Sequence, residues 1–172
     1  MSRYYYAEVR GDAGYATPTD MLVLTCPFDC EIEILHAYAG GRATAAQIVS
    51  YEYLVRSAAN VGGVKSSVPI QRYRTSAKPS QASVDLYSAA PSQLGAVRRS
   101  LALITQGLNA LTTSPAVTQL TTATGAQAGL ANRELLQFPV LEPGESLAIN
   151  FGGAALPAGY LGLMGVMWRE VT

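Results

Sequence analysis

The sequence predicts an all-β protein with a single domain, built as a β-sandwich or jelly roll. Short runs of alternating, β-branched and aromatic residues recur along the chain, and Gly, Pro, Asp or Asn separate them. The 172 residues match the usual size of one domain and suffice to bury one core. No solenoid repeat and no heptad seam is found. We therefore expect roughly seven to nine short strands over residues 1–172, packed as two sheets.

The first strands are predicted from alternation. "RYYYAEVRG" places Tyr5, Ala7 and Val9 on one face, and "DMLVLTCPF" follows as the second strand. The third run, "CEIEILHAYAGG", divides into an apolar and a wet face. The apolar face would carry Ile32, Ile34, His36 and Tyr38, and the wet face Glu31 and Glu33.

The later elements are less regular. "AQIVSYEYLVRSA" has the length of a helix, but its β-branched and tyrosine content favours a strand. "ASVDLYSA" reads as a short strand, and "GAVRRSLALIT" as either a strand or one helical turn leading into a strand. The final strands are expected in "ELLQFPVLEPGESLAINF" and "YLGLMGVMWREV".

Residues 106–132 are expected to form an extended loop or arm within the domain. This segment is rich in Thr, Ala and Gly and carries no charge. Loops of this length are uncommon in compact domains, and they tend to be functional or to order on binding.

Charge is scarce and unevenly distributed. Only 14% of the residues are charged and 49% are hydrophobic, which favours an oligomer or assembly component over a solitary monomer. Residues 1–52 carry a net charge of −4, residues 53–133 of +7 and residues 134–172 of −3. The overall net charge of zero argues against a nucleic-acid binder that acts by counterion release.

The basic middle supplies the candidate interface residues Arg72, Arg74, Arg98 and Arg99. Arginine pairs well with carboxylates, so these side chains could meet acidic patches of a second copy or of another protein. Contact with nucleic acid and a merely solvated basic face remain alternatives.

Catalytic groups are scarce, so no enzyme activity, metal site or cofactor is expected. His36 is the only histidine and is interpreted as a core or interface residue, which leaves a multi-histidine metal site without ligands. Glu31 and Glu33 lie two residues apart, as acids on a wet strand face commonly do, and a glycosidase pair is disfavoured. Cys26 and Cys30 are interpreted as reduced, half-buried thiols.

No membrane segment or secretory leader is expected. "YLGLMGVMW" is too short to cross a bilayer, and "MSRYYYAEVRGD" lacks a secretory apolar run, so synthesis in the cytoplasm is expected. The ten tyrosines, especially the N-terminal "YYY" with Tyr51 and Tyr53, suit either a protein interface or stacking on a sugar.

Four stretches together resemble the layout of small virion proteins of tailed bacteriophages: "YYYAEVRG", "MLVLTCPFDCEIEILHAYAG", "VPIQRYRTSAKPSQASVDLYSA" and "LEPGESLAINFGGAALPAGYLGLMGVMWREV". The resemblance implies a β-sandwich or jelly roll that decorates or cements the capsid, commonly as a trimer where capsomers meet. It implies the major capsid protein or other virion proteins as partners, and the virion as location. A tail or head-fibre attachment subunit and a sugar-binding jelly-roll module remain alternatives, since similar closing hairpins occur in receptor-binding and trimeric signalling jelly rolls.

Overall fold

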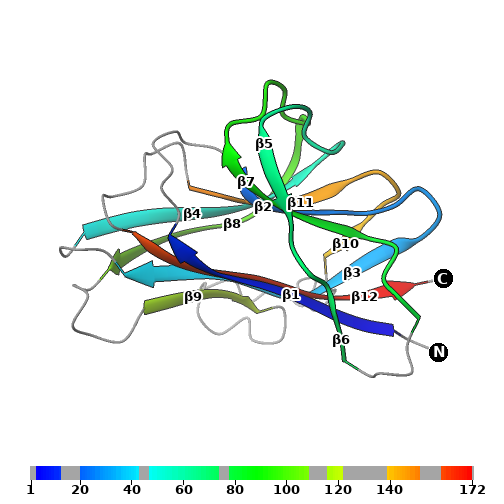
Figure 1. Cartoon of the computed structure of the whole chain (residues 1–172), viewed down its shortest axis with the longest axis horizontal. Helices are drawn as coiled ribbons and strands as arrows, with labels where there is room; N and C mark the ends of the chain where they lie inside the picture. The colour runs from blue at the N-terminus through cyan, green and yellow to red at the C-terminus, as the bar shows by residue number, and fades with distance from the viewer. Residues whose placement is uncertain are drawn as a thin grey trace.

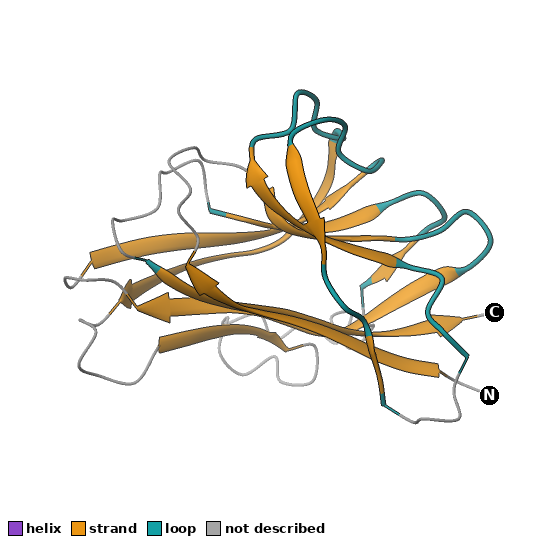
Figure 2. Cartoon of the chain, in the orientation of Figure 1, coloured by secondary structure: helices purple, strands orange, loops and turns teal. Residues whose placement is uncertain are grey.

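The computed structural model describes residues 3–12, 20–42, 47–73, 78–108, 116–121, 139–151 and 160–171. The regular elements in these ranges are all β-strands, as Figure 2 shows, so the expected all-β class is confirmed. The strands are β1 (Arg3–Asp12), β2 (Asp20–Thr25), β3 (Glu31–Arg42), β4 (Gln47–Arg56), β5 (Val64–Ser67), β6 (Gln71–Arg72), β7 (Ser83–Ala89), β8 (Val97–Leu108), β9 (Ala116–Thr121), β10 (Val140–Leu141), β11 (Ser146–Asn150) and β12 (Leu161–Val171).

The strands form two antiparallel sheets that pack against each other (Figure 1). Sheet A has the order β10-β3-β12-β1-β6, with β9 also paired to β3, and sheet B has the order β5-β7-β2-β11-β4-β8. Without β5, β6, β7 and β10, two four-stranded sheets remain, β9-β3-β12-β1 and β8-β4-β11-β2. Along the chain these eight strands alternate between the sheets, except that β4 and β8 are neighbours in sheet B. This is the strand order of a jelly roll, with β5 to β7 inserted between its fourth and fifth strands.

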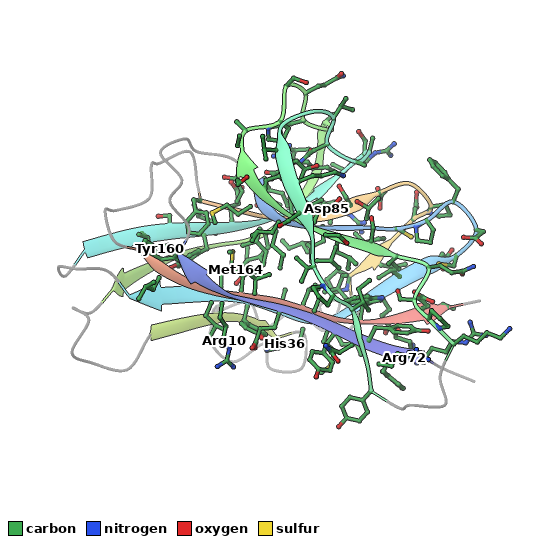
Figure 3. All side chains as sticks on the ribbon, in the orientation of Figure 1. Arg10, His36, Arg72, Asp85, Tyr160 and Met164 are labelled. Carbon is green, nitrogen blue, oxygen red and sulfur yellow. The ribbon has the colours of Figure 1, made fainter. Side chains whose placement is uncertain are left out.

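The core between the sheets is rich in aromatic rings. Trp168 of β12 stacks on Tyr5 of β1 with 5.8 Å between the ring centroids, and both side chains are fully buried. Phe151 contacts Tyr51 and Tyr160 edge-on, at centroid distances of 5.1 and 5.6 Å. Figure 3 shows Tyr160 between the two sheets. These rings supply a large part of the apolar area that stabilises the sandwich.

Strand β3 contains one residue more than its partner β12. His36 pairs with Met167 and Ile34 pairs with Trp168, so the register shifts by one residue at Leu35, which forms a β-bulge. Because side chains alternate between faces with a period of two, one extra residue reverses the faces of everything that follows.

The faces of β3 beyond the bulge are therefore the opposite of those expected. Ala37 and Ala39 are fully buried against sheet B, whereas His36 and Tyr38 lie half-buried on the outer face of sheet A. The prediction that His36 and Tyr38 share the face of Ile34 was wrong. Figure 3 shows His36 on the side of sheet A that points away from the core.

The chain between β4 and β8 covers part of the outer face of sheet B. The backbone N–H of Ser57 donates to the carbonyl of Ala96 at 2.9 Å, and Val61 and Gln93 form a β-bridge, which ties the two arms of this insertion together. A second, smaller cluster of buried side chains lies with it, namely Val23, Leu54, Tyr87 and Ala148.

A buried polar network fastens this insertion to the sheet. Asp20 is fully buried and accepts hydrogen bonds from Arg56, Asn60 and Asn150 at 2.5 to 2.8 Å. Arg56 also donates to the carbonyl of Gly95 at 2.8 Å. The Asp20 carboxylate thereby joins strands β2, β4 and β11 to both arms of the insertion.

The structure assigns strands within three segments whose secondary structure the sequence left open. The stretch "AQIVSYEYLVRSA" is strand β4, as its composition predicted, and "GAVRRSLALIT" lies in strand β8. Within the expected arm 106–132, the first residues end β8 and Ala116–Thr121 form β9, which pairs with β3. The remainder of that segment lies outside the described residues. A membrane-crossing helix is not found in the described ranges.

Candidate interaction surface

The four arginines predicted as an interface do not form one patch. Arg98 and Arg99 begin β8 at one edge of sheet B, whereas Arg72 lies on β6 at the far edge of sheet A, where Figure 3 labels it. Strand β8 approaches β9 and β3, so it stands on the opposite side of the sandwich from β6. Arg74 lies outside the described residues.

Arg98 and Arg99 surround a buried carboxylate. Arg99 Nη2 lies 3.1 Å from Glu145 Oε2 and donates to the carbonyl of Val140 at 2.7 Å, while Arg98 Nε lies 3.9 Å from Glu145 Oε1. The Glu145 side chain is only 6% exposed, whereas those of Arg98 and Arg99 are 59% and 44% exposed. Both guanidiniums therefore offset the negative charge of Glu145 while much of each arginine side chain stays exposed to solvent.

Glu145 is positioned by a tight turn between β10 and β11. Pro143 and Gly144 occupy its centre, Gly144 has a φ of 83°, and the N–H of Glu145 donates to the carbonyl of Glu142 at 2.9 Å. A proline at the second position of a turn and a positive φ at the third, here Gly144, are the pattern of a type II turn, which favours glycine at the third position. The Glu145 carboxylate also accepts the N–H of Glu142 at 3.0 Å, which fixes its direction.

The same turn supports an exposed aromatic ring. Phe28, in the loop between β2 and β3, is 88% exposed. A Cβ atom added to Gly144 would lie 2.7 Å from Phe28 Cε1, so the ring rests directly on this glycine. Cys26 anchors the loop, because its carbonyl accepts the N–H of Gly144 at 3.2 Å and its N–H donates to the carbonyl of Glu145 at 2.9 Å.

We call Phe28, Arg98 and Arg99 the loop-end surface. The Phe28 ring rests on Gly144, and the two guanidiniums contact the next residue, Glu145. Aromatic residues and arginine are the types that dominate the binding energy of protein interfaces. The sequence reasoning selected both arginines but missed Phe28. The signal for it was "CPFDC", in which a large apolar residue occupies the tip of a turn.

A second group of functional residue types lies on the outer face of sheet A. The Tyr38 ring lies over Gly165, where a Cβ atom would come within 2.4 Å of it, and its hydroxyl donates to the Glu8 carboxylate. Arg10 Nε donates to the other oxygen of Glu8 at 2.6 Å, and His36 lies beside Tyr38 with 5.5 Å between the ring centroids. Figure 3 shows Arg10 and His36 on this face.

Burial and hydrogen bonds shift the pKa values of Glu8, Tyr38 and His36 in this group. Burial raises the pKa of Glu8, but hydrogen bonds from Tyr38 and Arg10 outweigh it, so the pKa of Glu8 is lowered. Burial and the Glu8 carboxylate raise the pKa of Tyr38, and burial lowers the pKa of His36. Glu8 is thus an ionised acceptor, Tyr38 keeps its proton and His36 is neutral.

The other sequence candidates have structural partners. Glu33 pairs with Arg169, and Cys26 and Cys30 are free, buried thiols, deeper than expected. Burial raises the pKa of Cys26 to about 12. Among the described residues, no cluster of His, Cys, Asp and Glu is placed to hold a metal ion.

Tyr51 and Tyr53, which the sequence offered for sugar stacking, are fully buried in the core. Tyr4 and Tyr6 of the same set are 38% and 39% exposed and lie on β1, facing away from sheet B. Of the tyrosines named for stacking, these two are available at the described surface.

Comparison with protein-family models, curated proteins and solved structures gave no match.

Proposed function

We propose that this protein is a structural component of a phage virion, a decoration or cement protein that binds the major capsid protein through its loop-end surface. Two observations support the proposal: the resemblance in sequence layout, and a turn that carries the exposed Phe28 ring on Gly144 and the guanidiniums of Arg98 and Arg99 on the next residue, Glu145. Its physical role is to add contact area across subunit boundaries of the capsid.

The contacts beneath the loop-end surface support a docking role. The Phe28 ring rests on Gly144, and Arg99 is oriented by Glu145 and by the Val140 carbonyl, so part of the ordering that binding requires is already present. The partner would offer an apolar pocket for the ring and carboxylates or carbonyls for the guanidiniums.

The test is co-sedimentation with empty capsid shells assembled from the major capsid protein of the phage proposed to carry this chain. Phe28→Ala removes an exposed ring, so it should leave the fold intact and weaken binding by about 10-fold or more. Tyr73→Ala is the matched control. Tyr73 is likewise an exposed aromatic residue, with 69% of its surface accessible, but it adjoins β6 and lies away from β8. Equal binding by Phe28→Ala and the unaltered protein, or no binding by either, would contradict the proposal.

A second candidate, a sugar-binding module, is favoured by Tyr4 and Tyr6. Exposed rings on a sheet face can stack on sugar rings, and the charged pair Glu8 and Arg10 lies on the same face. A glycan array separates the candidates: binding that Tyr6→Ala abolishes and Phe28→Ala leaves unchanged would support the sugar module.

A further inference from the structure

The edges of the two sheets differ in how well they are protected against pairing with another strand. Natural proteins keep free edges short or charged. At the outer edges of the described sheets, β6 has two residues including Arg72, and β5 has four including Lys65, which bonds Asp85 at 2.7 Å. β10 is also only two residues long.

Strand β8 lacks this protection over half its length. It spans twelve residues at the end of sheet B, and β4 is its only ladder partner among the described strands. The β4–β8 register is irregular near Arg98 and Leu101 but unbroken from Ala102 to Leu108. The irregular part carries both arginines, whereas 102–108 contains no charge and no proline.

The outer face beside this edge is apolar and exposed. Leu103 of β8 is 63% exposed, and Ile48 of the neighbouring strand β4 is 77% exposed. Thr105 is also exposed and contacts Ser50 through their hydroxyl oxygens at 3.1 Å. A strand added along β8 would extend sheet B on the side away from β4 and cover Leu103.

We propose that two copies of this chain pair antiparallel through Ala102–Leu108 of β8, which joins their two B sheets into one continuous sheet. The charge pattern favours a second copy of this chain as the partner. In a two-fold antiparallel pair, Arg98 and Arg99 of one strand lie at the opposite end of the contact from those of the other strand. The uncharged segment then meets itself, and no like charges face each other. Such pairing closes with two copies, unlike the trimer that the resemblance implies.

Cysteine cross-linking tests the geometry on the full chain. Near a two-fold axis, identical residues of antiparallel strands approach to disulfide distance. When Ala102–Leu108 pairs with itself, Thr105 faces Thr105 of the other copy and Leu103 faces Gly107. Thr105→Cys should therefore form a covalent dimer under mild oxidation, while Leu103→Cys and Ile48→Cys should not. The natural cysteines are buried, and burial raises the pKa of both thiols, so they should not react.

Native mass measurement tests the association itself. The unaltered protein should appear at twice 18.1 kDa, Leu103→Lys should shift it to 18.1 kDa, and Ile48→Lys should remain a dimer. A monomer at high concentration, a trimer, a dimer indifferent to Leu103→Lys, or equal cross-linking at position 48 would each overturn the inference. The measurement uses no capsid, so its outcome is independent of the proposed function.

Discussion

Arg56 donates two hydrogen bonds to the fully buried carboxylate of Asp20, from Nε to Oδ2 at 2.5 Å and from Nη2 to Oδ1 at 2.7 Å. The pair crosses the outer face of sheet B and is closed over by Asn60 and Gly95 of the inserted segment. Removing one partner leaves the other buried without its counter-charge, which is among the most destabilising single changes in a fold.

We expect Arg56→Met to lower the free energy of unfolding by about 3 to 5 kcal/mol, measured by urea denaturation. Lys65→Met is the control, because its pair with Asp85 leaves the lysine side chain 46% exposed and contributes at most about 1 kcal/mol. Similar losses for the two variants would show that the Asp20 network does not hold the insertion in place.

Arg99 is expected to matter for stability as well as for binding. Arg99→Ala removes the 3.1 Å contact to Glu145 and should cost about 1 to 3 kcal/mol of unfolding free energy, because that carboxylate is nearly inaccessible to water. Arg98→Ala should cost less, since its contact is 3.9 Å long. Adding Glu145→Gln to Arg99→Ala should recover part of the loss, and no recovery would argue against a charge effect.

The contact between Tyr38 and Gly165 predicts a coupled pair of substitutions. Gly165→Ala should displace the Tyr38 ring, because the new methyl group would lie 2.4 Å from ring atoms. We expect a cost of about 1 to 3 kcal/mol, of which most disappears in a Tyr38→Ala background. Thermal unfolding of the four proteins of this cycle measures the coupling, and additive effects would disprove the contact.

Glu8 predicts a small acid-dependent loss of stability. In the folded protein the pKa of Glu8 lies below its ordinary value of about 4.5. The ionised carboxylate therefore stabilises the fold above pH 4.5, and this stabilisation is lost as the pH falls through the lower pKa of the folded state. Tyr38→Phe removes the hydroxyl donor and should raise the pKa of Glu8, which carboxyl NMR titration would record. An unchanged titration would mean that Arg10 alone sets this pKa.

The strands could be predicted because alternation is a local property, but the faces of β3 could not. Leu35 is an ordinary apolar residue in the sequence, and only the register shift between Met167 and Trp168 makes it a bulge. That register depends on a strand more than a hundred positions away. The bulge at Leu35 therefore places His36 and Tyr38 on the outer face and not on the expected inner face.

The charge blocks illustrate the same difficulty for the interaction surface. The sequence shows a basic middle between acidic ends, which suggests a partner for the excess arginines. In the fold, Arg56 is paired with Asp20 from the first block, and Arg99 with Glu145 from the last. Part of the asymmetry is thus balanced within the chain, which a count of charges along the sequence does not reveal.

The pairing of β3 with β12 also governs where other proteins can be attached. Glu31 stands opposite Val171, so the loop bearing Phe28 projects from the same end of the sandwich at which β12 stops. A fluorescent reporter fused behind β12 would crowd that ring, and a long spacer would relieve the obstruction. Labels on the Gly62–Gly63 turn, in the insertion over sheet B, would avoid it, which makes that turn the better handle for imaging or immobilisation.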